Sequence, residues 1–149
     1  MQDAGTTTAL AITWGSHQLT LNRAQLGLEP ADGGPFLYVE AHLGGAPECP
    51  SNSSPTPDQT FILANVPSGP AGSIYTMADG VRGTLFDFAG TLWPDVRPAS
   101  AVAVQVTVVQ RVLEPAASAF VVLDVNATFD GGTLSGRLAA PHCDSLDGP

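Results

Sequence analysis

The sequence of 149 residues contains no lysine, and its five arginines stand against 14 acidic residues, which gives a formal net charge of −9. A surface that binds nucleic acid needs clustered basic side chains, because these neutralise phosphates and release counterions. The five arginines are scattered along the chain and form no such cluster. We therefore expect no nucleic acid and no anionic membrane surface among the partners of this protein.

Long hydrophobic runs are also missing. No apolar stretch approaches the roughly 20 residues that cross a bilayer as a helix, and no charged and then apolar leader opens the chain. We predict no transmembrane span. The chain starts "MQDAGTTT", so we expect a flexible N-terminal segment at residues 1–7 and a single domain at residues 8–149, a length that supports one hydrophobic core.

Helical patterns are scarce, while the 16 glycines and 13 prolines argue against long helices. Short segments of strand character, rich in alternating apolar residues, lie between turn residues instead. In "FLYVEAHL" the alternation places Leu37, Val39, Ala41 and Leu43 on the face toward the core. The strand segments are 8–14, 17–26, 36–43, 60–66, 73–77, 81–93, 101–113, 118–129 and 133–140.

Turn chemistry links many of these segments directly. Gly15-Ser16, Asp79-Gly80 and Gly131-Gly132 are each predicted to close a hairpin. In segment 101–113 we expect one core-facing row, made of Val102, Val104, Val106 and Val108. Parallel pairing would require crossovers of a dozen or more residues, so the strands should pair antiparallel. The sequence predicts an all-β fold, an antiparallel β-sandwich of about eight or nine strands, with a closed β-barrel as the alternative.

Cysteine is rare: Cys49 lies in the loop "GGAPECPSNSSPTPD" and Cys143 in the C-terminal tail. Both neighbourhoods are polar and contain proline, so an unpaired thiol there would be exposed and reactive. We predict a Cys49–Cys143 disulfide that ties the loop and the tail together. The alternative is two free thiols, as in a cytosolic protein. Pairing indicates the periplasm, the outer cell surface or the extracellular space.

Two clusters invite a metal-site interpretation. His142 and Asp144 flank Cys143, and His17 or His42 could add ligands, but neighbouring residues do not easily chelate one ion together. The oxygen-bearing series Asp124, Asn126, Thr128 and Asp130 alternates along a predicted strand, so it should form the solvent face of that strand and not wrap a calcium ion. We predict no metal site.

Catalytic motifs are not assembled. There is no Gly-x-Ser-x-Gly turn between a strand and a helix. The glutamates, which could form an acid–base pair, are scattered and lie mostly in loops; they are Glu29, Glu40, Glu48 and Glu114. We expect no catalytic residues, no cofactor and no enzyme activity.

Three aromatic residues are candidate stacking platforms for a sugar or another small ligand: Trp14, Trp93 and Tyr38. Both tryptophans end a strand, just before Gly15 and Pro94, and Tyr38 lies opposite the apolar face of its strand. Tryptophans at the rim of a sandwich more often cover the core than bind a ligand, so we favour that interpretation for Trp14 and Trp93 and keep a shallow ligand site as the alternative.

The tail "FDGGTLSGRLAAPHCDSL", residues 129–146, resembles the ends of uncharacterised secreted or lipid-anchored β-proteins from high-GC bacteria of the myxobacterial kind. In those proteins a similar stretch forms a final hairpin followed by a paired cysteine. The resemblance implies an envelope location and a β-fold. It also implies a lipid anchor ahead of the chain, where Met1 would stand in place of a lipidated cysteine and "QDAGTTT" would be the linker.

These observations favour a non-catalytic interaction module of the cell envelope or extracellular space that binds another protein. Its binding surface is expected in the loops at 29–35, 44–59 and 67–73, or on a free edge strand. The alternative is a carbohydrate-binding or small-ligand-binding β-sandwich.

Overall fold

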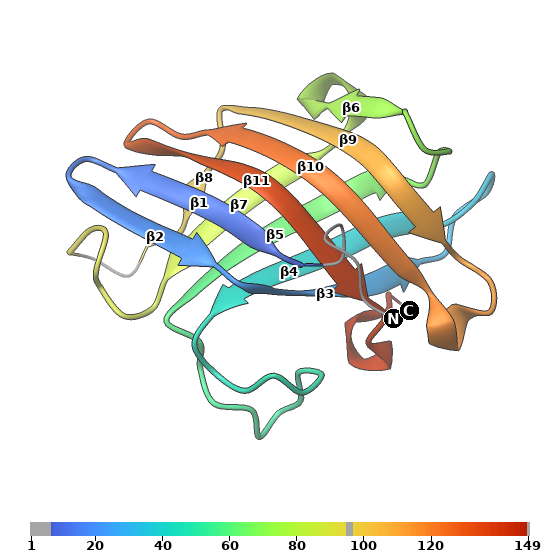
Figure 1. Cartoon of the computed structure of the whole chain (residues 1–149), viewed down its shortest axis with the longest axis horizontal. Coiled ribbons are helices and arrows are strands. Elements are labelled where there is room, and N and C mark those ends of the chain that lie inside the picture. The colour runs from blue at the N-terminus through green and yellow to red at the C-terminus, as the bar shows by residue number, and fades with distance from the viewer. Residues whose placement is uncertain (1–6, 95–96, 149) are drawn as a thin grey trace.

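The computed structural model describes residues 7–94 and 97–148, and in it the chain forms two antiparallel sheets packed face to face (Figure 1). The six-stranded sheet has the order β2-β1-β11-β10-β9-β6, and the five-stranded sheet has the order β3-β4-β5-β7-β8. The sheets do not close into a barrel, so the predicted antiparallel β-sandwich is confirmed and the barrel alternative is wrong.

The described residues form eleven strands and three single turns of 3-10 helix, with no α-helix. The strands are β1 (Ala9–Trp14), β2 (His17–Leu21), β3 (Arg23–Glu29), β4 (Phe36–Leu43), β5 (Gln59–Pro67), β6 (Ile74–Thr76), β7 (Arg82–Asp87), β8 (Ala99–Ser100), β9 (Ala103–Val112), β10 (Phe120–Thr128) and β11 (Gly132–Pro141). The 3-10 turns are η2 (Met77–Asp79), η3 (Ala116–Ser118) and η4 (Asp144–Leu146). No helix in the described part of the chain is long and apolar enough to span a membrane.

The strand count exceeds the expected eight or nine for two reasons. The predicted strand at 17–26 is divided at Asn22, where the chain leaves the six-stranded sheet as β2 and enters the five-stranded sheet as β3. The backbone N–H of Asn22 donates to His42 O at this corner. The second addition is the two-residue strand β8, which is too short to give a sequence pattern.

Two of the three predicted hairpins are confirmed. The loop Gly15-Ser16 joins β1 to β2, and the turn at Gly131-Gly132 joins β10 to β11. The hairpin predicted at Asp79-Gly80 is wrong, because β6 pairs with β9 while β7 pairs with β5 in the other sheet. Here Thr76 and Asp79 cap η2 reciprocally, and Gly80, with φ of 100°, redirects the chain between the sheets.

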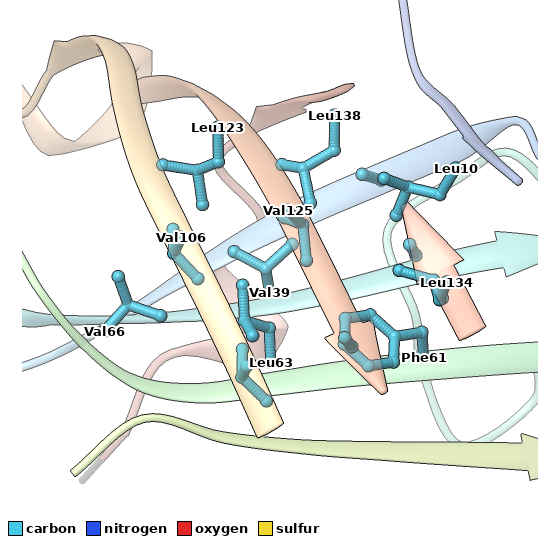
Figure 2. Close-up of a cluster of buried hydrophobic side chains, with 14 of the residues drawn as sticks. Leu10, Val39, Phe61, Leu63, Val66, Val106, Leu123, Val125, Leu134 and Leu138 are labelled. Atoms are coloured by element: carbon cyan, nitrogen blue, oxygen red, sulfur yellow. The ribbon is translucent and has the colours of Figure 1, made fainter. Parts of the chain in front are cut away.

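The core lies between the sheets and is filled from both inner faces (Figure 2). β9 follows the predicted alternation from Val104 through Val106 to Val108, all buried. Val102 was expected in the same row, but this expectation is wrong: Val102 precedes β9, where the alternation begins, and is 57% exposed. Its backbone N–H donates to Thr128 O where the chain enters the sheet. The labelled core residues in Figure 2 are Leu10, Val39, Phe61, Leu63, Val66, Val106, Leu123, Val125, Leu134 and Leu138.

The C-terminal tail covers the free edge of β3. Leu26 pairs with His142 in a parallel bridge, and the N–H groups of Cys143 and Gly148 donate to Leu26 O and Leu28 O. The tail approaches so closely that a Cβ on Gly27 would overlap the backbone of Leu146, which explains a glycine inside this strand. The edge of β3 is therefore unavailable for pairing with another chain. Residues 1–6, the greater part of the predicted flexible segment, lie outside the described residues.

Candidate functional site

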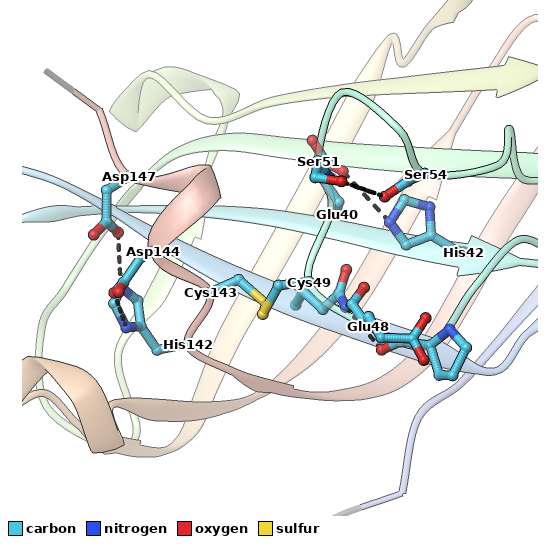
Figure 3. The surroundings of a disulfide bond; sticks show 12 residues. Glu40, His42, Glu48, Cys49, Ser51, Ser54, His142, Cys143, Asp144 and Asp147 are labelled. Carbon is cyan, nitrogen blue, oxygen red and sulfur yellow. Dashed lines mark hydrogen bonds and ion pairs between the residues drawn. A yellow bond between two sulfur atoms is a disulfide. The ribbon is translucent and has the colours of Figure 1, made fainter.

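The Cys49–Cys143 disulfide is present, as predicted, with a Cα–Cα distance of 5.5 Å. It joins the tail to the loop between β4 and β5, residues 44–58, which we call the roof loop (Figure 3). Cys143 is buried and Cys49 is exposed. The disulfide thus anchors the roof loop, which has no regular secondary structure, to the sandwich at a residue in the interior of the loop.

The two tryptophans proposed as stacking platforms lie together at one end of the core. The ring centroids of Trp14 and Trp93 are 4.7 Å apart, and Trp14 also contacts Phe129 at 5.6 Å. Both side chains are half-buried and pack against the core, and Trp93 Nε1 donates to Arg97 O. This packing matches the favoured interpretation, in which the two tryptophans cover one end of the core.

Tyr38, the third predicted platform, is not part of that cluster. It lies half-buried on β4, and its hydroxyl donates to Glu40 Oε2 at 2.6 Å. The structure therefore brings Trp14 and Trp93 together and places Tyr38 in a polar network on the five-stranded sheet.

The roof loop and the outer face of the five-stranded sheet enclose a hollow of about 360 Å³, which we call the sheet hollow. That volume lies within the range of small-ligand pockets. Its floor comes from four neighbouring strands in register: Arg23 faces His42, His42 faces Thr60, and Thr60 faces Phe86. The lining residues are Arg23, Gln25, Glu40, His42, Ala46, Glu48, Pro50, Ser54, Pro55, Thr56, Pro57, Thr60, Ile62, Phe86 and Phe88.

A chain of hydrogen bonds crosses this floor. Glu40 Oε2 accepts from the Tyr38 hydroxyl. Glu40 Oε1 lies 3.4 Å from His42 Nε2, and Figure 3 marks this contact with a dashed line. The other ring nitrogen of His42, Nδ1, is 2.9 Å from Thr60 Oγ1. The side chains of Glu40 and His42 are thereby held in fixed orientations under the roof loop.

Two pKa values change with this network. Burial alone would raise the pKa of Glu40, but the hydrogen bonds from His42 and Tyr38 outweigh it and lower the pKa below its usual range. Burial, and then the hydrogen bond to the Glu40 carboxylate, raises the pKa of Tyr38. Glu40 is therefore an ionised carboxylate at neutral pH, and Tyr38 is a neutral donor.

The roof loop is fastened to the floor by β3. Gln25, only 4% exposed, donates through Nε2 to Pro47 O and Glu48 O. Arg23 Nη2 donates to Gly44 O at 2.9 Å. Gln25 Oε1 and Arg23 Nε are buried without a hydrogen-bond partner among the described residues. Both atoms are shielded from solvent, so the floor keeps one unsatisfied acceptor and one unsatisfied donor in its interior.

The apolar wall of the sheet hollow was not predicted from the sequence. Phe86 and Phe88 stack with centroids 5.5 Å apart and planes 11° apart, and Phe88 is 51% exposed. They face outward because Leu85 and Asp87 occupy the inward positions of β7. The alternation Leu85-Phe86-Asp87-Phe88 could have predicted this wall. It does so only if Asp87 is assumed to be buried, which is unusual for an aspartate.

Of the other predicted loops, 29–35 and 67–73 lie close together, and both line a second hollow with Tyr75. They make no contribution to the sheet hollow, whose lining comes from the roof loop and the sheet.

The structure brings together two of the weighed metal ligands, His142 and Asp144, and leaves His17 and His42 out of that cluster. Among the described residues, His142, Asp144 and Asp147 place ligand atoms within 4.8 Å of one another, and Asp147 was not anticipated. Asp147 Oδ1 already accepts from His142 Nε2 and from Leu28 N, so this cluster fastens the tail to β3. Cys143 is in the disulfide, and His42 is in the sheet hollow.

The predicted polar face of β10 is present in the six-stranded sheet. Asp124 pairs with Arg137 of β11 through two hydrogen bonds, of 2.8 and 3.1 Å. Asn126 and Thr128 line a separate, more open hollow beside Val102, of about 420 Å³.

Comparison with known proteins gives no relative: no protein-family model, no curated protein and no solved structure matches this chain.

Proposed function

We propose that this protein is a non-catalytic binding domain that acts in the cell envelope or extracellular space, and that the sheet hollow is its binding site. The observation that carries the proposal is the hollow itself: about 360 Å³, with an aromatic and proline-rich wall over a floor of oriented polar groups. Small-ligand sites combine mostly apolar walls with a few placed polar groups in this way. The disulfide supports the oxidising location, and the lipid anchor stays a prediction from the resemblance of the tail.

The same groups argue for binding over turnover. Thr60, His42 and Glu40 follow the order hydroxyl, imidazole, carboxylate that hydrolases use. Thr60 is only 5% exposed, however, so its hydroxyl is poorly placed to attack a carbonyl carbon from the hollow. We therefore assign these residues to shaping the floor.

The test is a thermal-shift screen of sugars, amino acids and small organic acids against the wild type, Phe88→Ala and Val102→Ala. Phe88 and Val102 are similarly exposed, at 51% and 57%, but only Phe88 lines the sheet hollow. We expect the ligand-induced rise in melting temperature to disappear in Phe88→Ala and to persist in Val102→Ala. Equal shifts in both variants would place the binding site elsewhere.

A partner protein is the second candidate, and the exposure of Phe88 at the mouth of the hollow favours it. Immobilised wild-type protein should then capture a protein from envelope extracts that immobilised Phe88→Ala fails to capture. Identical capture by both would remove Phe88 from any protein interface.

A further inference from the structure

The sheet hollow is polar at one end and apolar at the other. Arg23 and Gln25 on β3, with Glu40 and His42 on β4, form the polar end. Ile62 on β5 and the stacked pair Phe86–Phe88 form the apolar end. Strand spacing of about 4.8 Å puts the backbones of β3 and β7 about 14 Å apart across three intervals, and the side chains shorten the space between the two ends.

The charges at the polar end are unequally satisfied. Both oxygens of the Glu40 carboxylate already have a partner, the Tyr38 hydroxyl and the His42 ring. The guanidinium of Arg23 has only the neutral Gly44 carbonyl and no carboxylate partner among the described residues, and its Nε has no acceptor. A guanidinium is best satisfied by a carboxylate, which can accept two of its N–H groups at once.

We propose that the sheet hollow binds a ligand in which a short linker joins a carboxylate to an apolar, preferably aromatic, group. The carboxylate accepts hydrogen bonds from Arg23, and the apolar group packs against Ile62, Phe86 and Phe88. This ligand class rests on the proposed function, because it presupposes that the hollow is the binding site. The carboxylate can belong to a free organic acid or to the C-terminus of a polypeptide.

Two lining carboxylates, those of Glu40 and Glu48, oppose such a ligand. The hydrogen bonds that Glu40 accepts from Tyr38 and His42 partly offset its charge. Glu48 carries a second carboxylate in the lining of the hollow, on an exposed position of the roof loop. Because solvent and salt screen an exposed charge, Glu48 should weaken the binding of an acid without preventing it. Glu48→Gln is therefore expected to bind the acid more tightly than the wild type does.

The experiment is isothermal titration of the whole chain with 3-phenylpropionate and with 3-phenylpropionamide, which share a ring and linker and differ in charge. We expect the wild type to bind the acid about tenfold or more tightly than the amide, as a charge-assisted hydrogen bond would produce. Arg23→Gln should lose that preference. Arg111→Gln, which removes an exposed arginine on β9 of the other sheet, should retain it.

The acid–amide comparison in the wild type needs no variant, so it tests the carboxylate preference even if Arg23→Gln fails to fold. In that event Arg23→Lys is the milder substitution to measure. Equal affinity of acid and amide overturns the carboxylate assignment. If Phe88→Ala still weakens both compounds, the hollow stands as the binding site, and the proposed function survives that failure. Absence of binding by both compounds also overturns the inference.

A second pair of ligands separates the two sources of the carboxylate. The tripeptide Gly-Gly-Phe and its C-terminal amide present the same ring on a polypeptide end. Tighter binding of the free-carboxylate peptide than of 3-phenylpropionate assigns the site to a chain terminus, whereas the reverse order assigns it to a free acid. Both results require Arg23. If Arg23→Gln loses the preference for the free carboxylate over the matching amide, in the peptide pair or in the phenylpropionate pair, the contact is confirmed.

Discussion

At the scale of single residues, Asp87 links the core to the apolar wall of the sheet hollow. It is 4% exposed and accepts hydrogen bonds from Gln59 Nε2 and from the backbone N–H groups of Thr91, Leu92 and Trp93. These bonds fix the segment that follows β7. Phe88 at the start of this segment lines the sheet hollow, and Trp93 near its end packs against Trp14. One buried carboxylate thus organises both an exposed aromatic wall and a lid on the core.

The Asp87→Asn variant should be less stable than the wild type by about 1 to 3 kcal/mol at pH 7, because an amide cannot accept all of these hydrogen bonds. Burial alone would raise the pKa of Asp87, but the bonds from Gln59 and the three backbone N–H groups outweigh it and lower the pKa. Its contribution to stability is therefore present above the unfolded-state pKa, about 3.9, and is lost as pH falls through the lower folded-state pKa. Urea unfolding between pH 7 and pH 2 measures this loss.

The variant should show a shallower loss of stability in acid than the wild type. Asp124→Asn is the matched control: its carboxylate also has a lowered pKa, through a hydrogen bond from Arg137, but it lies on the exposed face of β10. The control substitution should change the dependence of the free energy of unfolding on acidic pH less than Asp87→Asn does. If the free energy of unfolding falls equally with decreasing pH in the wild type and in Asp87→Asn, the role given to this carboxylate is contradicted.

At the scale of elements, the roof loop depends on covalent and polar anchors. Its side-chain anchors are the hydrogen bonds from Gln25 and Arg23, and the disulfide ties it to the tail. At its C-terminal end the backbone of Asp58 donates to Leu43 O and accepts from Ala89 N–H. Its apolar residues are mostly prolines that line the hollow and lie outside the core. Removal of an anchor should therefore disturb the roof more than the sandwich.

The Cys49→Ser/Cys143→Ser double variant should unfold about 2 to 5 kcal/mol more easily than the oxidised wild type, since the disulfide closes a loop with a sequence separation of 94. Denaturant titration of both proteins gives the difference, and wild type kept in reductant should resemble the double variant. Ligand affinity should fall as well, because the roof loop loses its tie to the tail. Unchanged stability and affinity would show that the polar anchors suffice.

Periodicity predicted elements well where each strand has one buried face. It identified the segments of β1, β4, β9, β10 and β11, and the two glycine-containing hairpins. It failed at Asp79-Gly80, where the same turn residues connect two sheets, because a turn signal is local and sheet membership is set by packing across the core. The site was missed in part because Phe86 and Phe88 are apolar residues on an outer face, and apolarity is normally evidence for burial.

At the scale of the whole molecule, the sandwich has two unlike sides. On one side the chain passes between the sheets at Asn22, and the C-terminal tail covers β3 (Figure 1). On the other side the sheets end in the short strands β6 and β8. Edges this short offer little template for another chain. The remaining edge of the described sheets is β2, five residues long, so the proposed site on the outer face beneath the roof loop competes with one edge strand only.

The central claim is that ligands enter the sheet hollow, and NMR shift mapping tests it most directly. A ligand from the thermal-shift screen would be titrated into isotopically labelled full-length protein while the backbone and His42 ring resonances are followed. We predict that the largest changes fall on Arg23, His42, Thr60 and Phe86, which form one row across four strands. Changes centred instead on Val102 and Asn126, or on the loops at 29–35 and 67–73, with the row unaffected, would contradict the account.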